Sequence, residues 1–277
     1  MSCEPLSLTR EIVDFPIGNI PLKQHQRMVL ELAALKVAME IDPQAWLAAS
    51  DLRQLAESHR TTLIDDRGTP VAWCGKQADL NSVMVAADSF AIRFPWDLIK
   101  ANELFVSGLT ESVIHGEVHP SAVIEGSVVI GEGSRILPGV FIEGKVVIGA
   151  NCKIGPNCYI RGNTSIGDSC HIGQSVEIKN CLILSNTNVG HLSYVGDSVL
   201  GHKVNFGAGT NVSNLRHDGK SHRSMVNGEL IDTGRRKFGA IVGDHVHTGI
   251  NTSVYPGRKF WPNTSTLPGE VVKHDVI

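Results

Sequence analysis

The feature that most constrains the fold is an isoleucine repeated at every sixth position. Ten isoleucines follow one another at this interval without a break: Ile124, Ile130, Ile136, Ile142, Ile148, Ile154, Ile160, Ile166, Ile172 and Ile178. Two residues before each stands a small or β-branched residue: Ala122, Val128, Ser134, Val140, Val146, Cys152, Cys158, Thr164, Cys170 and Val176. Helices repeat every 3.6 residues and strands every two, so a period of six fits neither as one continuous element.

The period predicts a left-handed parallel β-helix, in which each hexapeptide makes one short strand and one turn. Three hexapeptides then close one triangular coil, which places Cys152 directly against Cys170. Glycine often follows the isoleucine, as at Gly149 and Gly167, and permits turn conformations that other residues resist. β-Branched side chains pack well in such ladders, with coils at the strand spacing of about 4.8 Å. The fold class is therefore mainly β.

The six-residue phase slips after Ile178 at least twice. Units restart at Val189, Val195, Leu200, Phe206 and Val212, and the pattern then vanishes until it resumes at Val242, Thr248, Val254, Phe260 and Thr266. The interval predicts a loop at residues 213–237 that leaves one corner of the coil and returns. Long loops inside compact repeats usually carry function.

Residues 1–106 show no such repeat. Segments 21–41 and 43–58 read as amphipathic helices, 61–75 as a hairpin turning at Asp66, Arg67 and Gly68, and 94–108 as a connecting helix. We therefore predict a small α/β domain with a linker helix at 1–106, and a β-helix acyltransferase domain at 107–277. No glycine-rich loop of the "GxGTR" type occurs, so a nucleotidyl-transfer site is not predicted.

Composition narrows the class of protein further. The net charge of −3 gives no basic field for nucleic acid. No apolar run approaches the roughly 18 residues that span a membrane, and the N-terminus lacks the pattern of a signal peptide. The six cysteines include three at repeat positions, where they read as small buried residues of a reducing compartment. We therefore expect a cytoplasmic protein with no nucleic-acid or membrane partner.

The slipped region contains a cluster of polar residues. His191 alone would read as a surface histidine, but five polar residues fall within about three coils of it: Arg161, Lys179, Tyr194, Asn205 and Asn214. Such a mixture suits a polyhydroxylated, anionic small molecule. A histidine is largely neutral at pH 7 and can accept a proton from an attacking amine or hydroxyl group.

The loop at 213–237 is basic. Its cations are Arg216, Lys220, Arg223, Arg235, Arg236 and Lys237, and with Asp218, Glu229 and Asp232 they leave a net charge of +3. The segment is either a solvated charged loop or a clamp on the phosphates of a sugar phosphate or of coenzyme A.

Two other motifs carry weaker signals. "FGAGT", residues 206–210, lacks the lysine and the following helix of a P-loop, and fits better as backbone N–H groups for a thioester carbonyl or pantetheine arm. His245 and His247 have strand spacing, and with His191 or His202 a zinc site is conceivable. A third ligand at a matching phase is missing, so we predict no metal.

Four motifs, "VEIKN", "GHLSYVGD", "NFGAGT" and "SNLRHDG", resemble the acetyltransferase half of a known family. These are the glucosamine-1-phosphate acetyltransferase/N-acetylglucosamine-1-phosphate uridyltransferases, in their archaeal-type sugar-1-phosphate branch. The resemblance covers about residues 95 to 270 and does not extend to the uridyltransferase domain, which we therefore expect to be absent. It implies transfer of acetyl from acetyl-CoA, as co-substrate, to the amine of glucosamine or galactosamine 1-phosphate. Prisms of this kind usually form homotrimers, because flat faces pack around a threefold axis.

The resemblance also assigns roles to single residues. By position, His191 matches the general base, and Asn214 an asparagine beside the reacting amine and acetyl group. Arg161 and Lys179 match sugar-phosphate ligands, Tyr194 and Asn205 match sugar contacts, and Ala208 matches a backbone contact to acetyl-CoA. Lys220 and Arg223 stand where the archaeal-type branch has two lysines, and Arg235 and Arg236 complete the cations assigned to coenzyme A or a neighbouring subunit. Leu215 replaces the tyrosine of the bacterial enzymes.

Three alternatives remain open from the sequence. The prism could bind sugar nucleotides without turnover, as a scaffold or regulatory partner. It could acetylate a UDP-amino sugar instead of a sugar 1-phosphate. Metal-dependent hydration is the third, and would require zinc.

Overall fold

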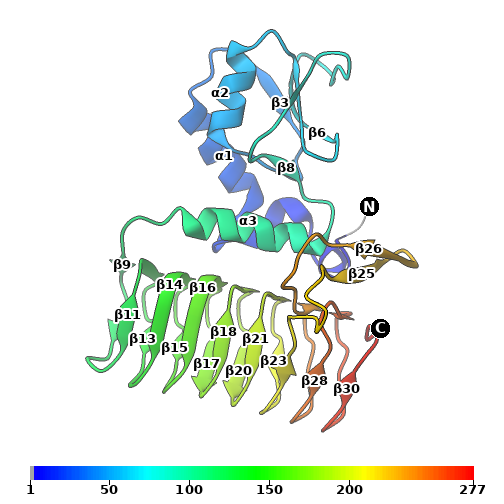
Figure 1. The fold of residues 1–277 in the computed structure, drawn as a ribbon. Helices are drawn as coiled ribbons and strands as arrows, with labels where there is room; N and C mark the ends of the chain where they lie inside the picture. Colours follow the sequence, from blue (N-terminus) through cyan, green and yellow to red (C-terminus); the bar gives the residue numbers. More distant parts are fainter. Residues whose placement is uncertain (1–2) are drawn as a thin grey trace.

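The hexapeptides coil into a left-handed parallel β-helix, seen in a computed structural model that describes residues 3–277 (Figure 1). Successive coils are offset by three hexapeptides, so Ile136 pairs with Ile154 and Ile154 with Ile172. Lys153 pairs with His171 in the same register, which confirms the predicted stacking of Cys152 on Cys170. The coil has three faces, each a parallel ladder of short strands.

The strands of face 1 are β10 Glu117–Val118, β13 Arg135–Ile136, β15 Lys153–Ile154, β17 His171–Gln174, β20 Asn188–His191 and β23 Asn205–Phe206. Those of face 2 are β11 Val123–Glu125, the first parts of β14 Phe141–Ile148 and β16 Tyr159–Ile166, then β18 Glu177–Lys179, β21 Tyr194–Gly196, β24 Asn211–Val212, β28 Ser253–Val254 and β30 Val271–Val272. Face 3 contains β9 Val113–Ile114, β12 Val128–Ile130, the second parts of β14 and β16, then β19 Leu182–Ile183, β22 Val199–Leu200, β27 Ile241–Val242 and β29 Lys259–Phe260.

The core of the solenoid consists of the residues that the repeat predicts. Isoleucines from Ile130 to Ile178 and the apolar residues two positions before them form one buried cluster, which continues through Val195, Phe206 and Val254. Each coil therefore buries its own inward side chains against the coils before and after it. The stack gains stability with every added coil and needs little contact between distant segments.

The N-terminal residues form a separate cap above the solenoid (Figure 1). Its elements are two short 3-10 helices at Leu6–Leu8 and Ile12–Asp14, β1 Pro16–Ile17, β2 Ile20–Pro21, α1 Leu22–Ala33, β3 Met39–Ile41, β4 Ala45–Trp46, α2 Ala49–Glu57, β5 Thr62–Ile64, β6 Pro70–Cys74, β7 Val83–Val85, β8 Phe90–Ala91 and α3 Pro95–Ser107. Strands β3, β6, β5 and β7 form one sheet in that order.

Both predicted cap helices were too long. The first ends where Ala34 adopts a left-handed conformation with φ 50°, and Met39–Ile41 then joins the sheet by pairing with β6. The second is preceded by Ala45–Trp46, which pairs with β8. In both places a short strand finds a partner far along the chain, and tertiary pairing overrides local helix propensity. The predicted hairpin at 61–75 is confirmed as β5 and β6.

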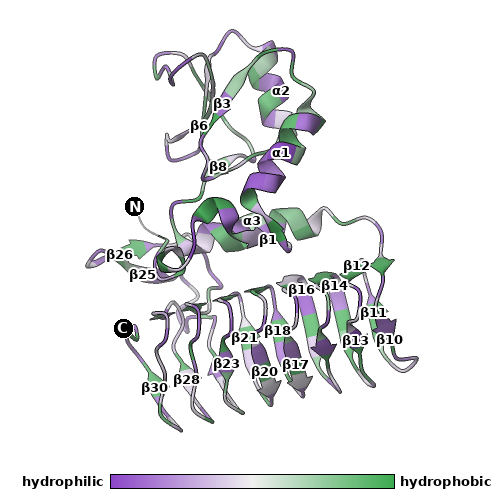
Figure 2. Ribbon diagram, turned by 180° about the vertical axis from the view of Figure 1, so that it is seen from behind, coloured by the Kyte–Doolittle hydropathy of each residue, from purple (hydrophilic) through white to green (hydrophobic). Residues whose placement is uncertain are grey.

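Helix α3 is the part of the cap that lies along the solenoid. Figure 2 shows this helix between the solenoid and the rest of the cap, seen from behind. Its apolar residues share a buried cluster with the outward side chains of face 3, including Leu182, Val199 and Ile241. Around these three residues the outer surface of face 3 is therefore covered and is part of a core. Within residues 3–277, no helix has the length and hydrophobicity that crossing a bilayer requires.

The predicted loop at 213–237 contains an antiparallel hairpin, β25 Arg223–Val226 and β26 Glu229–Asp232. Asn227 and Gly228 form its turn with φ values of 50° and 84°, the pattern of a tight hairpin turn. Val226 and Ile231 pack against the cluster shared by α3 and face 3. The segment is therefore folded onto the cap side of the solenoid, and the Asn-Gly pair after Val226 is the sequence signal for its hairpin.

Candidate active site

Face 2 presents two columns of polar side chains, one residue from each successive coil. The first column is Tyr159, Glu177, Tyr194 and Asn211, and the second is Glu143, Arg161 and Lys179, which ends where Gly196 pairs with Lys179. These residues flank inward positions such as Ile160 and Ile178 and therefore point outward, because strand side chains alternate between faces. The parallel register thus stacks residues that are a whole coil apart in the sequence.

The predicted slips lie at the corner between faces 2 and 3. Lys179 still pairs with Arg161, three full hexapeptides before it, but Leu182 pairs with Ser165, so one residue has been lost at this corner. The next coil is short by the same single residue. The shortened corners contain Asn180 and Asp197, with φ values of 53° and 51°. Asparagine and aspartate tolerate this left-handed conformation better than most residues. The slip therefore places polar side chains at the edge of face 2.

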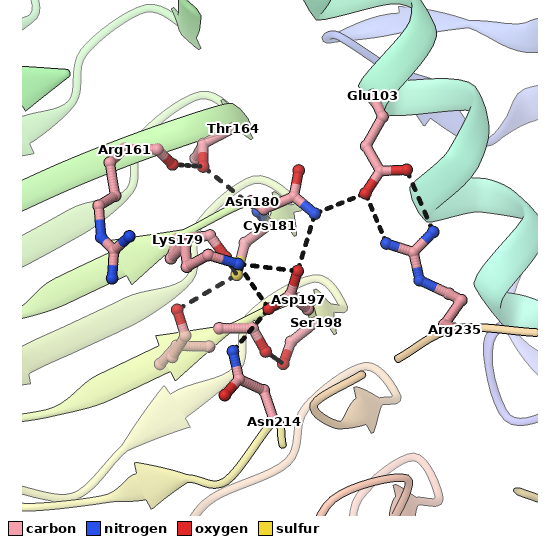
Figure 3. A network of polar contacts seen from close by, with 12 residues as sticks. Glu103, Arg161, Thr164, Lys179, Asn180, Cys181, Asp197, Ser198, Asn214 and Arg235 are labelled. Carbon is pink, nitrogen blue, oxygen red and sulfur yellow. Dashed lines mark hydrogen bonds and ion pairs between the residues drawn. The ribbon is translucent and has the colours of Figure 1, made fainter. Parts of the chain in front are cut away.

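Asp197 is the hub of a polar network at this corner (Figure 3). It is only 2% exposed. Its carboxylate accepts hydrogen bonds from the Lys179 ammonium at 2.8 and 3.1 Å, from the Asn214 amide at 2.6 Å and from the Asn180 amide at 3.0 Å. The carboxylate compensates the buried charge of Lys179, and together these bonds hold both amides in one orientation.

The amide of Asn214 has both of its N–H bonds engaged. Nδ2 donates to Asp197 and, at 2.9 Å, to the Tyr194 hydroxyl. An amide nitrogen carries two hydrogens, so it has none left for an oxyanion. A role of Asn214 as an oxyanion donor does not fit this geometry, and its Oδ1 is the atom that can meet a substrate N–H. Its backbone oxygen is bound by the Phe238 N–H at 3.0 Å and by the His222 ring at 3.1 Å.

Tyr194 serves this network as a neutral phenol. Burial, followed by the nearby charges of Asp197 and Glu177, raises the pKa of its hydroxyl above the ordinary value. A phenol with a raised pKa stays protonated at neutral pH and does not act as a base. Its hydroxyl can accept from Asn214 while donating its own hydrogen to a sugar oxygen.

Arg161, predicted to bind the sugar phosphate, is paired with Glu177 on the same face. Its Nε and Nη2 atoms donate to one carboxylate oxygen at 2.9 and 2.7 Å, and both side chains are about one-third exposed (34% and 33%). Arg161 also lies over the ring of Tyr159, with its guanidinium carbon 5.3 Å from the centroid. Arg161 and Lys179 therefore sit on one ladder, each already oriented by a carboxylate.

His191 lies at the other edge of face 2, at the corner with face 1. Its side chain is exposed, and its backbone oxygen accepts from the Gly209 N–H at 3.1 Å. Ala208, adjacent to Gly209, therefore lies one coil further along the same corner. Asn205 is on face 1, paired with Asn188. The structure brings Lys179, Tyr194 and Asn214 together, whereas in the described chain the hydrogen bonds of this network include neither His191 nor Asn205.

A cavity of about 600 Å³ opens next to Asn214. It is lined by Ser213, Leu215, Arg216, His217, Asp218, Tyr255 and Pro256. Its volume is within the range of small-molecule sites. Arg216 closes one side through a two-point pair with Asp218, at 2.7 and 2.9 Å. Tyr255 and Pro256 were missed in the sequence because the pattern around them is that of an ordinary coil.

The predicted phosphate clamp is divided by the structure. Lys220, Arg223 and Arg236 are not buried and lie on the extruded segment. Arg235 is different, because its guanidinium is held by Glu103 of α3 at 2.5 and 3.1 Å and its side chain is only 17% exposed. Its donors therefore serve an ion pair with the cap, and its role as a cofactor ligand stays a prediction.

The histidines considered for zinc do not form a site. His245 has a φ of 60° and lies in a turn, so it does not share a face with His247 as strand spacing would require. Its ring meets that of His202 edge-on, with centroids 6.0 Å apart. Among residues 3–277, no three His, Cys, Asp or Glu side chains are grouped closely enough to hold a metal ion.

Four further residues of the network were missed in the sequence: Glu103, Asn180, Asp197 and His222. Asn180 and Asp197 had a signal, because both directly follow positions at which the six-residue phase slips. Glu103 and His222 had none, since their partners lie on other elements. His222 is 2% exposed, and burial lowers its pKa, which keeps the ring neutral.

Comparisons with known proteins identify a matching family model and relatives of this chain. The family model of the GMPPB C-terminal domain matches residues 142–265. A bifunctional sugar-1-phosphate nucleotidylyltransferase/acetyltransferase of Sulfurisphaera tokodaii is 44% identical over 182 residues, which are 66% of this chain and 45% of that protein. The bifunctional protein GlmU of Methanococcus aeolicus is 38% identical over 182 residues, 66% of this chain and 44% of its own.

The fold is that of the hexapeptide-repeat left-handed β-helices, with columns of polar side chains on face 2. Within this fold, the matched region of this chain is related to the bifunctional sugar-1-phosphate nucleotidylyltransferase/acetyltransferases, and the predicted resemblance is confirmed. The chain spans less than half the length of these two relatives.

Proposed function

We propose that this protein is an N-acetyltransferase that moves the acetyl group of acetyl-CoA to the amine of an amino-sugar 1-phosphate. One observation carries the proposal: the hydrogen-bonded network of Lys179, Asp197, Asn214 and Tyr194 lies where the six-residue phase slips, beside a cavity of about 600 Å³. The names of the relatives, which include a sugar-1-phosphate nucleotidylyltransferase/acetyltransferase, favour this reaction over other uses of such a site.

In this mechanism the substrate amine attacks the thioester carbonyl, and His191 accepts the proton that the amine loses. Acetyl-CoA supplies the activated acyl group; as its C–S bond breaks, protonated His191 returns the proton to the sulfur, and the coenzyme leaves as the thiol. The exposed imidazole of His191 is open to an incoming substrate. Asn214 Oδ1 would accept a hydrogen bond from the amine N–H and so orient its lone pair.

The remaining groups fit parts of the two substrates. Arg161 and Lys179 are the cations for the sugar phosphate, and the Tyr194 hydroxyl is a sugar contact. The backbone N–H groups of Gly207 and Gly209 are already bonded to neighbouring coils. Among residues 3–277, no such partner is found for the N–H of Ala208, which leaves it to stabilise the oxyanion. The loop cations Lys220, Arg223 and Arg236 can meet coenzyme A phosphates.

The site would be completed by a second copy of the chain. His191 and Asn214 lie at opposite edges of face 2, whose strands advance by about 3.3 Å per residue. Asn205 faces away on face 1. A homotrimer that brings face 1 of one copy against face 2 of the next would join these residues around one substrate.

The test of the reaction is release of free coenzyme A from acetyl-CoA in the presence of amino-sugar 1-phosphates and UDP-amino sugars. We expect turnover with glucosamine or galactosamine 1-phosphate. The His191→Ala variant should lose on the order of 10²- to 10⁴-fold in kcat, the usual contribution of a general base. Full activity of that variant would remove His191 as the base. No turnover with any acceptor would reject the enzyme function and favour a non-catalytic scaffold. Turnover with UDP-amino sugars alone would show that the acceptor is a UDP-amino sugar and not a sugar 1-phosphate.

The shared site has its own test. Each of His191→Ala and Asn214→Ala should be inactive alone. Coexpressed variants should regain activity at about one quarter of the sites, because random association in a symmetric oligomer puts an intact His191 beside an intact Asn214 at that frequency. No recovery in the mixed oligomer would show that both residues act from one chain.

A further inference from the structure

The cap reaches the polar network of the solenoid through one carboxylate, that of Glu103 on α3 (Figure 3). One of its oxygens accepts from the Asn180 amide at 2.6 Å, and the two together hold the Arg235 guanidinium at 2.5 and 3.1 Å. The side chains of Glu103 and Arg235 are 27% and 17% exposed. A two-point pair of this kind, partly shielded from water, fixes orientation as well as distance.

Asn180 connects this pair to the hub. Its Nδ2 donates both to Glu103 and, at 3.0 Å, to Asp197. Both hydrogens of the amide are therefore used, one toward the cap and one toward the site. Asp197 in turn holds Lys179 and Asn214. A continuous chain of hydrogen bonds thus runs from α3 to the residues of the proposed reaction.

The extruded segment is held by this chain near both of its ends. At the start, Asn214 is bound through its side chain to Asp197 and through its backbone oxygen to the Phe238 N–H. Near the end, Arg235 is bound to Glu103. The start of the segment lines the cavity at Asn214, and the Phe238 N–H bond ties the returning end to that start, so a shift of either end changes the shape of the cavity.

We propose that Glu103 is a positioning residue for acetyl transfer, and that the cap is thereby part of the catalytic unit. The inference rests on the proposed function and extends it, because it gives a role to a domain in which the sequence shows no chemical motif. Glu103 touches neither substrate. It sets the orientation of Asn214 through Asn180 and Asp197, and it holds the returning end of the segment through Arg235.

The experiment compares the full-length protein with Glu103→Gln, which keeps the shape of the side chain but removes its charge and one acceptor. We expect kcat to fall about 10- to 100-fold while KM for both substrates changes little, because a misplacement of about 1 Å can cost that much in rate. Glu103→Asp should recover part of the loss. Glu57→Gln, at the end of α2 in the cap, is the matched control and should behave as the wild type.

A double-mutant cycle tests the route. If Glu103 acts together with Arg235, the Glu103→Gln/Arg235→Gln variant should lose no more activity than the worse single variant. Additive losses would show that the two side chains act separately and would overturn this half of the proposal.

A second measurement does not depend on turnover. Hydrogen exchange of peptides covering residues 213–238 should be faster in Glu103→Gln than in the wild type and unchanged in Glu57→Gln. Faster exchange with unchanged kcat would make Glu103 merely structural and overturn the inference, and a loss of kcat with unchanged exchange would overturn the route through the segment. If the wild type turns over no acceptor, the proposed function fails, and the exchange rates still decide whether Glu103 holds the segment.

Discussion

The coils before and after Lys179 share the same three faces but differ in their corners. Before it, coils of three full hexapeptides stack isoleucine on isoleucine, and the corner between faces 2 and 3 carries Gly144 and Gly162. The two coils that follow it are each one residue shorter, and there the same corner carries Asn180 and Asp197, whereas the coils after the extruded segment regain three full hexapeptides. Both kinds of residue adopt left-handed backbone there, but only the second kind has a side chain. The difference shows how a repeat gains chemistry: a corner position acquires functional groups while the fold is kept.

Removing the charge of Asp197 is the strongest test of whether the shortened coils carry the function. Asp197→Asn keeps a residue that tolerates the left-handed corner and leaves Lys179 without its partner. We expect the free energy of unfolding to fall by about 3 kcal/mol or more, the cost of an uncompensated buried charge, and kcat to fall on the order of 100-fold. Chemical denaturation and coenzyme A release measure the two effects.

The matched control is Asp168→Asn in the regular coils. Asp168 is exposed and accepts the Ala150 N–H at 2.7 Å, so it has a structural bond but no place in the network. A small change in stability and no change in kcat are expected. Equal losses of activity in both variants would mean that the shortened coils are not functionally distinct.

A substitution that creates a cavity in the regular coils should lower stability but leave kcat unchanged. Ile154 is fully buried between Ile136 and Ile172, and Ile154→Ala removes side-chain volume that its neighbours cannot refill. The expected loss is about 2–5 kcal/mol in the free energy of unfolding. Well below the melting temperature kcat should be unchanged, as assayed by coenzyme A release. A large fall in kcat would show that the regular coils take part in the reaction.

The same substitution, glycine to alanine, can be made on face 1 before and after Lys179, at Gly173 and at Gly190. A Cβ at Gly173 would lie 1.9 Å from the Gly190 backbone oxygen, whereas a Cβ at Gly190 would meet no atom within 4 Å. We therefore expect Gly173→Ala to cost about 1–3 kcal/mol, as overpacking does, and Gly190→Ala to be close to neutral. Thermal unfolding of the two variants measures the difference, and equal melting temperatures would contradict it.

The fold was predictable because the solenoid is local. Each hexapeptide specifies its own strand and turn, so the positions of Ile124 to Ile178 determine the register without knowledge of distant contacts. The cap lacks this property. Its strand Met39–Ile41 is stabilised by pairing with Ala72–Cys74, which lies far along the chain beyond α2 and β5. The hairpin in the extruded segment was predictable from Asn227–Gly228, whereas the net charge of the segment indicates only a charged loop or a phosphate clamp.

The candidate site was predictable only where it follows the repeat. Lys179 and Tyr194 occupy columns that the period defines, Asn214 follows the last regular unit, and the structure brings the three together. Asp197 stands in the quoted motif "GHLSYVGD", yet a carboxylate in a row of cations and amides was not recognised as their common partner. Glu103 could not be found from the sequence, because its contact with Arg235 joins distant parts of the chain and depends on how α3 lies over face 3.

The smallest expected effect concerns His222, whose ring contacts the Asn214 backbone oxygen in the shortened region. Burial, with Arg216 adding to it, lowers the pKa of this histidine below 6.5 in the folded state. Below pH 6.5 the unfolded chain therefore binds more protons than the folded one, so stability is complete above that pH and falls as the pH drops through it. One such group changes the free energy of unfolding by at most about 1.4 kcal/mol per pH unit.

His222→Gln keeps a donor for Asn214 and removes the titration. Urea denaturation at pH 7.5, 6.5 and 5.5 should show a shallower loss of stability in this variant than in the wild type. A residual slope is expected in both proteins, because burial also lowers the pKa of His25 and His171. His171 is on the regular side of the slip, so His171→Gln is the matched variant. Identical slopes in wild type and His222→Gln would mean that the ring is not held neutral against Asn214.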